Sequence, residues 1–180
     1  MKLYHGTKCQ DIISFDFAHS KQNSDFGKGV YFTTNFQQAI EWSVKHSETG
    51  AVYECDVDFS GFNVRSFLSD QDENQLYVLY LCRIGLEEIV PDSVDDFEKA
   101  DFVSGFLLDG SVSDFCEKAD QFNQGDITFE EFRNRIKLYG KGKDQICVKT
   151  AGALDYINRS LRCIYLTEKT TNGINIVEKK

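Results

Sequence analysis

The chain has 180 residues, of which 41% are hydrophobic and 27% charged, and its formal net charge is -9. This length fits one compact domain and this composition argues against overall disorder, so we expect a single domain over residues 1–180. The charge is uneven, because residues 87–131 carry 14 acidic and 2 basic groups while residues 132–180 carry 11 basic and 4 acidic ones. Since the acidic segment would repel a phosphate backbone, nonspecific binding of nucleic acid is not expected.

Localisation and metal content can also be addressed from the composition. The chain shows no apolar run of signal-peptide or membrane-span length, so we expect a cytoplasmic protein with no membrane partner. Its six cysteines include no C-x-x-C pair and have no histidine at ligand spacing. This pattern favours buried thiols in a reducing compartment over a metal site.

The first sixty residues predict three strands, a polar loop and a helix. The predicted strands are residues 2–5, 29–33 and 51–59. A polar loop is expected at 14–24, and Asn35 is the predicted N-cap of a helix at 36–46 with one apolar face. In the third strand polar and apolar residues alternate, which predicts one buried and one exposed face.

The rest of the chain predicts further helices interleaved with strands. The predicted helices are residues 72–86, 113–122, 128–138 and 153–161. The predicted strands are residues 102–108, 145–150 and 163–167. Because helices and strands are interleaved and strands cluster late, an α+β fold is favoured over a doubly wound parallel sheet.

Residues 120–131 share part of the pattern of a calcium-binding loop. Gly125 and Glu131 occupy its sixth and twelfth positions, but the third position, which must supply an oxygen ligand, is Phe122. A phenylalanine cannot bind calcium. We therefore interpret the segment as a turn that leads into a helix capped by Thr128, with Glu131 as the reciprocal partner of the capping box.

Two motifs near the N-terminus carry most of the functional signal. They are residues 3–7 (LYHGT) and residues 26–33 (FGKGVYFT). Glycines let a ligand approach the backbone closely, and each motif places them next to a strand. Each motif alone also fits a hairpin turn or a core residue. Together they predict a clamp for a flat, charged ligand such as a nicotinamide nucleotide.

Both motifs resemble those of the ADP-ribosyltransferase superfamily, in the His-Tyr-Glu branch that includes diphtheria-toxin-like enzymes and poly-ADP-ribose polymerases. Residues 5–7 match the first motif of that branch and residues 27–32 match the second. A helix containing Trp42 and a strand at 144–150 extend the resemblance to a bacterial group within the superfamily. The resemblance implies a split antiparallel β-sheet core with flanking helices, and a toxin-like glycosyltransferase that uses NAD and no metal.

The resemblance implies a role for each matched position. His5 would hydrogen-bond a ribose hydroxyl, while the backbone of Gly6 would pair with the nicotinamide carboxamide. Tyr31 would stack on the nicotinamide ring, and Trp42 is either a second aromatic wall or a core residue of its helix. The remaining nucleotide-binding positions of the matched motifs are Thr7 and Gly29.

The third motif departs from the family. Gln145 stands where the catalytic glutamate is expected, which makes His5, Tyr31 and Gln145 the predicted catalytic set. An amide keeps a hydrogen bond to the ribose but loses the charge that stabilises an oxocarbenium-like transition state. The chain would then be slow, recruit another carboxylate such as Asp144, or be inactive. Ala39 also replaces a small hydroxyl residue that contacts the carboxamide in several family members.

We therefore expect an NAD-dependent ADP-ribosyltransferase that releases nicotinamide and passes ADP-ribose to a macromolecule. The alternatives are a catalytically silent NAD- or ADP-ribose-binding module and an NAD glycohydrolase. A thiol hydrolase using Cys9 with His5 has less support, because the sequence places no third orienting group beside them. The acidic segment favours a protein acceptor over a nucleic acid, and it would suit a basic inhibitor or antitoxin-like partner.

Overall fold

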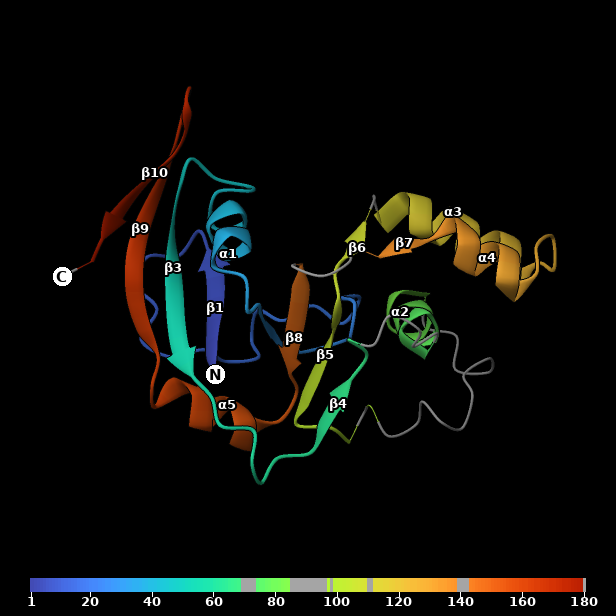
Figure 1. Cartoon of the computed structure of the whole chain (residues 1–180), viewed down its shortest axis with the longest axis horizontal. Helices are drawn as coiled ribbons and strands as arrows, with labels where there is room; N and C mark the ends of the chain where they lie inside the picture. The colour runs from blue at the N-terminus through green and yellow to red at the C-terminus, as the bar shows by residue number, and fades with distance from the viewer. Residues whose placement is uncertain (69–73, 85–96, 98, 110–111, 139–142, 180) are drawn as a thin grey trace.

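The computed structural model describes residues 1–68, 74–84, 97, 99–109, 112–138 and 143–179, which form an α+β fold (Figure 1). The strands are β1 (Lys2–Thr7), β2 (Val30–Phe32), β3 (Thr49–Asp56), β4 (Val64–Ser66), β5 (Phe102–Phe106), β6 (Leu108–Asp109), β7 (Lys137–Leu138), β8 (Asp144–Val148), β9 (Arg162–Thr170) and β10 (Gly173–Glu178). The helices are α1 (Phe36–Ser43), α2 (Asn74–Ile84), α3 (Val112–Asn123), α4 (Phe129–Arg135) and α5 (Ala151–Asn158). The predicted α+β class is confirmed.

The strands form two four-stranded sheets and one small two-stranded sheet. Sheet A has the order β1-β3-β9-β10 and is antiparallel throughout. Sheet B has the order β2-β8-β5-β4 and is mixed, because β4 runs parallel to β5. The two sheets meet at one isolated bridge, where Tyr4 and Thr33 exchange backbone hydrogen bonds of 2.8 and 2.9 Å.

The largest buried cluster joins both sheets to α5. Its fully buried members include Leu3 and Tyr53 from sheet A, Phe32 and Phe102 from sheet B, and Ile157 from α5. Burying a side chain of this size stabilises a fold by about 1.5–3 kcal/mol. The cluster therefore holds the two sheets side by side, although among the described residues only one backbone bridge joins them.

Helix α1 packs directly onto β1 because Gly6 has no side chain. A Cβ atom at Gly6 would lie 1.8 Å from the backbone oxygen of Ala39. The predicted N-cap is confirmed, since the Asn35 side chain accepts a hydrogen bond of 3.0 Å from the backbone N–H of Gln38. The helix ends at Ser43, earlier than predicted, and Ala39 lies on its buried face as expected.

Strand β3 is buried on both faces, so the prediction of one exposed face was wrong. Val52 lies under Ile40 of α1 in a separate buried cluster. Glu54, on the same face, forms ion pairs with Lys2 and Arg162 and is itself buried. The alternation of polar and apolar residues gave a wrong prediction here, because helix α1 and the two cations paired with Glu54 cover the face that carries the polar residues.

The turn between α3 and α4 confirms the interpretation as a capped helix start. Gly125 adopts a φ of 77°, and its N–H and that of the next residue bond back to Phe122 and Gln121. These are the hydrogen bonds of a Schellman helix end. Thr128 and Glu131 then form the predicted capping box of α4.

Other predicted elements differ in extent. The helix expected at 72–86 is described only as α2, and the rest of it lies outside the described residues. The strand expected at 102–108 is divided into β5 and β6. Strand β9 is longer than predicted, and β10, which contains Ile174, Ile176 and Val177, was missed.

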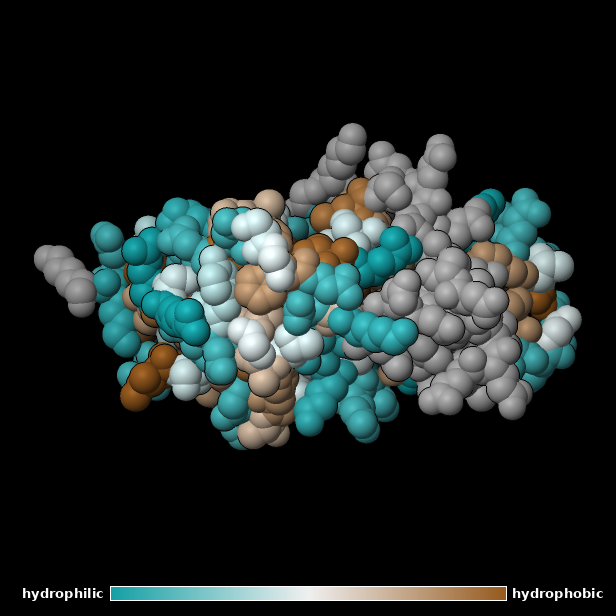
Figure 2. Space-filling model, turned by 90° about the horizontal axis from the view of Figure 1, so that it is seen from below, coloured by the Kyte–Doolittle hydropathy of each residue, from teal (hydrophilic) through white to brown (hydrophobic). Residues whose placement is uncertain are grey.

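The described surface is predominantly hydrophilic where it can be seen. Figure 2 shows hydrophilic residues interspersed with smaller hydrophobic areas on the face viewed from below. None of the described helices is long and apolar enough to cross a membrane.

Candidate functional site

A cavity of about 620 Å³ lies where β2, β8, α1 and α2 approach one another. This volume is within the range of small-molecule sites. Three predicted residues line it, namely Tyr31 from β2, Trp42 from α1 and Gln145 from β8. The fold thus brings together side chains that are far apart in the sequence.

Strand register explains why Tyr31 and Gln145 share the cavity. Tyr31 is paired with Cys147 across sheet B, and Gln145 lies two residues from Cys147 on the same strand. Because side chains alternate along a strand, all three project from one face of the sheet. Phe32 and Ile146 are a register pair on the other face, in the main core.

The ring of Tyr31 is held by the loop that precedes its strand. Its hydroxyl donates a hydrogen bond of 2.7 Å to the Gly27 carbonyl and accepts one of 2.9 Å from the Phe26 N–H. Gly27 adopts a φ of 73°, which an L-residue rarely adopts, so the turn favours glycine there. Burial raises the pKa of Tyr31 far above its ordinary value, so the phenol is neutral.

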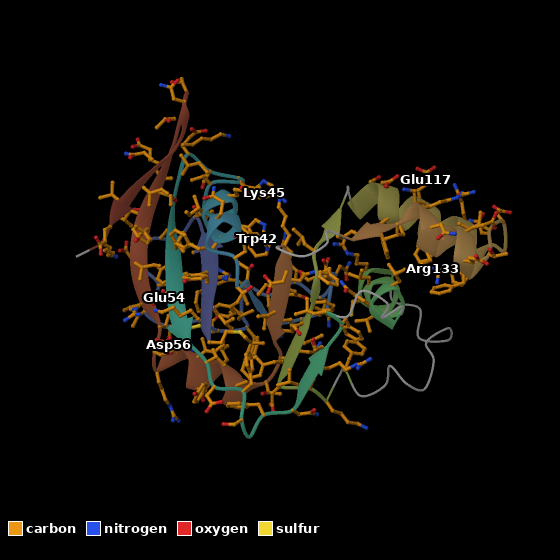
Figure 3. The ribbon with its side chains drawn as sticks, viewed as in Figure 1. Trp42, Lys45, Glu54, Asp56, Glu117 and Arg133 are labelled. Atoms are coloured by element: carbon orange, nitrogen blue, oxygen red, sulfur yellow. The ribbon has the colours of Figure 1, made fainter. Side chains whose placement is uncertain are left out.

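Trp42 lies at the cavity. It is half-buried, and it belongs to none of the buried clusters formed by the described residues. Figure 3 shows Trp42 and Lys45 on the side of α1 nearer to β8, whereas Glu54 lies on sheet A away from it. Between the two readings of Trp42, this placement favours a cavity wall over a core residue.

His5 occupies the point where the two sheets separate. Beyond the bridge between Tyr4 and Thr33, the next hydrogen-bonded pair of an antiparallel ladder would be Gly6 with Tyr31. The Tyr31 carbonyl instead accepts a hydrogen bond of 2.7 Å from Nδ1 of His5. A side chain has taken the place of a backbone partner, and the sheets diverge from there.

The chemical state of His5 follows from this contact and from its surroundings. Its ring packs against Phe15 and Phe32, with centroids 4.5 and 5.5 Å away. Desolvation lowers the pKa of His5 below its ordinary value, so the ring is neutral near pH 7. Since Nδ1 donates to a carbonyl, we assign the proton to Nδ1 and leave Nε2 as an acceptor.

The remaining predicted positions do not line the cavity. The backbone N–H and C=O of Gly6 point to the edge where the sheets have separated. Gly6 lies two residues after Tyr4 on β1, and backbone groups two residues apart on a strand point to the same side. Thr7 accepts a hydrogen bond of 3.3 Å from the Cys9 N–H through its hydroxyl. A Cβ atom at Gly29 would lie 2.2 Å from the sulfur of Cys147, so this glycine permits close packing on β8.

Gln145 is fixed in one orientation. It is 3% exposed, and its Nε2 donates to the carboxylate of Asp25 and, at 3.3 Å, to the Phe106 carbonyl. Both partners can only accept, so the amide nitrogen must face them. Within the described ranges Oε1 has no hydrogen-bond partner, which leaves it available to a ligand.

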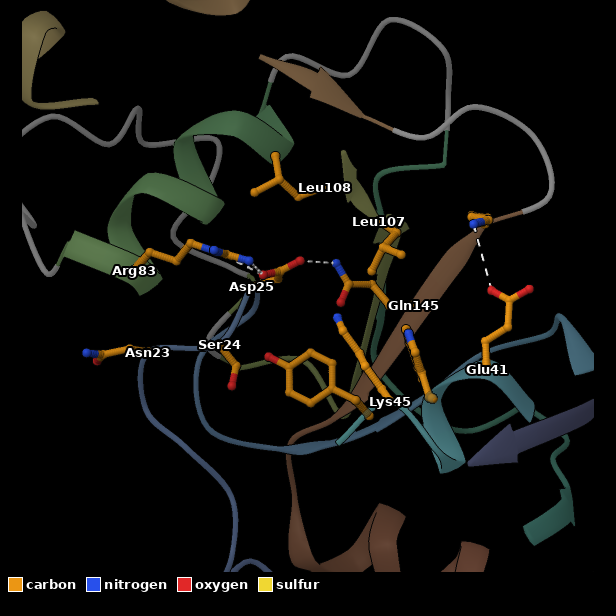
Figure 4. Close-up of a pocket in the computed structure, with 12 residues that line it drawn as sticks. Asn23, Ser24, Asp25, Glu41, Lys45, Arg83, Leu107, Leu108 and Gln145 are labelled. Carbon is orange, nitrogen blue, oxygen red and sulfur yellow. Dashed lines mark hydrogen bonds and ion pairs between the residues drawn. The ribbon is translucent and has the colours of Figure 1, made fainter. Parts of the chain in front are cut away.

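Sequence reasoning missed the two residues that surround Gln145. The Asp25 carboxylate, 7% exposed, accepts hydrogen bonds from Nε, at 2.9 Å, and Nη2 of Arg83. Figure 4 shows Asp25 between Arg83 and Gln145 at the cavity. Asp25 directly precedes the glycine motif, which was the available signal for it, whereas nothing in the sequence marked Arg83.

Asp144, the carboxylate considered as a replacement for glutamate, is hydrogen-bonded to residues outside the cavity. It accepts hydrogen bonds from the Thr33 hydroxyl at 2.7 Å, the Thr34 hydroxyl at 2.9 Å and the Thr34 N–H at 3.0 Å. It adjoins Gln145 on β8 and therefore projects from the opposite face of the strand. The carboxylate beside Gln145 is that of Asp25.

Comparison with known proteins identifies a family. The search of curated proteins and the search of solved structures each found no match. Residues 1–158, which run from β1 through α5 and include the whole lining of the cavity, match a family model described as a protein of unknown function, DUF3990. The chain therefore belongs to the DUF3990 family.

Proposed function

We propose that the protein is an NAD-dependent ADP-ribosyltransferase, with its nicotinamide site in the cavity beside Gln145. The observation that carries the proposal is that Tyr31, Trp42 and Gln145 line one cavity. His5 is hydrogen-bonded to the backbone of the same tyrosine. The two N-terminal motifs and the third motif thus meet in space.

The arrangement of the sheets supports the same proposal. In the part of the chain that the structure describes, sheets A and B share a single bridge and then separate at His5. An ADP-ribosyltransferase-like split sheet would have its cleft at such a separation. Gly6 does not line the cavity itself, but its backbone N–H and C=O are directed to that separation and would suit the carboxamide of nicotinamide, which offers both donors and an acceptor.

The aromatic side chains suit the leaving group. The nicotinamide ring of NAD is a flat cation, and Tyr31 and Trp42 both line the cavity. A cation over an aromatic face gains about 0.5–2 kcal/mol, with the larger values at desolvated sites. Binding of the charged ring would therefore depend on both residues.

Gln145 would act on the ribose. In the reaction the bond between C1′ and the nicotinamide nitrogen breaks, its electron pair neutralises the ring, and positive charge develops on the ribose. Oε1 of Gln145 would accept the hydrogen bond of the 2′-hydroxyl. The acceptor nucleophile then bonds to C1′ and loses its proton to solvent. Because the amide is neutral, we expect turnover about 10²–10³-fold slower than in an ADP-ribosyltransferase with an ionised glutamate at this position.

A binding module without turnover is the second candidate. The observation that favours it is the pairing of Asp25 with Arg83, since the carboxylate bonded to Gln145 is thereby held in an ion pair and is not itself free to act on the ribose. Such a module would bind NAD or ADP-ribose with the same cavity. It would release no nicotinamide.

One assay distinguishes these functions. The purified protein is incubated with NAD labelled on its adenylate phosphate, with and without cell lysate, and free nicotinamide is measured. The transferase requires nicotinamide release together with label on a protease-sensitive product. Release without macromolecular label indicates a glycohydrolase, and no release at high protein concentration excludes both catalytic functions.

Binding variants test the location of the site independently of turnover. Trp42→Ala should weaken NAD binding about tenfold in calorimetry, corresponding to about 1.4 kcal/mol. Tyr31→Ala and His5→Ala should weaken it as well. Tyr165→Ala is the matched aromatic control, because Tyr165 is half-buried on sheet A and does not line the cavity. Equal affinities for NAD in all four variants would show that NAD does not bind in the cavity.

A further inference from the structure

We infer that Asp25 is a positioning residue that acts through Gln145, and that Arg83 holds Asp25 in place. The inference rests on the proposed function, and it concerns two residues to which the resemblance assigned no role. Asp25 and Arg83 both line the cavity. They come from different segments, the loop before Gly27 and helix α2, and they meet only in the folded chain.

The hydrogen bonds show which side chain orients which. One carboxylate oxygen of Asp25 takes both contacts from Arg83, and the other takes the contact from Gln145. The side chains of Asp25 and Arg83 are 8% and 9% exposed, so the pair is shielded from water. Arg83 also lies over the ring of Phe115, with its Cζ 5.6 Å from the centroid. The guanidinium therefore fixes the carboxylate, and the carboxylate fixes the amide.

The charge on Asp25 also changes the chemistry of Gln145. Hydrogen bonds in a chain polarise one another in a medium of low dielectric constant. An anionic acceptor on Nε2 draws the amide proton and shifts electron density toward Oε1. Gln145 would thus present a more negative oxygen to the ribose than an isolated amide could.

The same geometry predicts how a glutamate at position 145 would behave. Gln145→Glu alone places a second carboxylate at hydrogen-bonding distance from Asp25, and such like charges raise the pKa of one member. We therefore expect Gln145→Glu alone to give no gain in nicotinamide release. Gln145→Glu combined with Asp25→Asn restores a donor opposite the carboxylate and should raise the rate above that of the single variant.

The kinetic test uses a pair of variants that differ in one charge. Asp25→Asn alone would leave a buried guanidinium poorly paired and risks loss of the fold. Arg83→Met removes that guanidinium and keeps the carboxylate, while Arg83→Met with Asp25→Asn removes the charge as well. We expect kcat for nicotinamide release to fall about tenfold or more between these two variants, with KM for NAD nearly unchanged. An equal kcat in both would overturn the electrostatic role.

A spectroscopic test does not depend on turnover. The side-chain amide signal of Gln145 is assigned in the nuclear magnetic resonance spectrum by its loss in Gln145→Met. A charge-assisted hydrogen bond should shift it downfield in the wild type. Arg83→Met, which removes the group that holds Asp25, should keep only part of this shift, and Asp25→Asn in the Arg83→Met background should abolish it. An unchanged signal would overturn the positioning role even if the protein releases nicotinamide. A shifted signal without nicotinamide release would support the positioning role and overturn the proposed function.

Discussion

Asp25 and Asp144 are buried to the same degree, at 7% and 8% exposure, and both lie beside the start of β8, yet they have different partners. Among the described residues, the Asp144 carboxylate accepts hydrogen bonds from neutral groups of Thr33 and Thr34, at the junction of β2 and α1. Asp25 is bonded to Arg83 and to Gln145 at the cavity. A buried carboxylate can thus hold the chain in one case and orient a functional group in the other.

The largest effect on stability is expected at Asp144. Asp144→Ala leaves the donors of Thr33 and Thr34 without their acceptor, which should lower the free energy of unfolding by about 3 kcal/mol. Urea denaturation measures this change. Asp11→Ala is the control, because its side chain is 97% exposed and the same substitution there should cost less than about 0.5 kcal/mol. Equal losses in the two variants would contradict the structural role of Asp144.

A smaller loss is expected when one of the donors is removed. Thr33→Val deletes the hydroxyl that bonds to Asp144 and should cost about 2 kcal/mol, since Thr33 is fully buried. Combined with Asp144→Ala, it should add less than its own cost, because the bond is already gone. Strict additivity in urea denaturation would show that the two residues do not interact.

At the cavity, urea denaturation should give a still smaller loss in the free energy of unfolding. Replacing Asp25 and Arg83 together, by Asn and Met, removes both charges of the pair and leaves no uncompensated ion. We expect the free energy of unfolding to change by about 1 kcal/mol or less. A loss as large as that of Asp144→Ala would mean that Asp25 serves the fold as much as the site, and would end the contrast between the two carboxylates.

The smallest effect concerns a third titratable group, the half-buried His5, and depends on pH. Desolvation lowers the pKa of His5 in the folded state, so the unfolded chain takes up the proton first as the pH falls. Stability from this group is complete above its ordinary pKa of about 6.5 and is lost as the pH falls below it. Between pH 7.5 and 5.5 the wild type should lose up to about 1 kcal/mol more than His5→Gln in urea denaturation. An equal loss would place the pH dependence in other residues.

Local signals in the sequence predicted much of this molecule. Asn35 and the capping box at Thr128 were found because a helix start depends on a few adjacent residues. Tyr31, Trp42 and Gln145 were proposed as site residues from motifs, and the fold brings them to one cavity. In each case the signal lay within a short stretch of sequence.

What the sequence did not reveal depends on tertiary contacts. Arg83 reaches Asp25 across 58 positions of the chain, and no periodicity or motif records that pairing. The buried polar face of β3 was missed for the same reason, because α1 and the cations around Glu54 cover it. The sequence pattern therefore could not predict contacts between side chains that are distant in the chain, such as that of Arg83 with Asp25.

The hydrogen bond between His5 and Tyr31 has a consequence for acidic conditions. Nδ1 already carries a proton and donates it to the Tyr31 carbonyl, so a second proton would enter at Nε2. The contact at the junction of the sheets would survive this event. What changes is the other nitrogen of the ring, which turns from an acceptor into a donor. A ligand hydroxyl that gives its proton to His5 at neutral pH would have to receive one in acid.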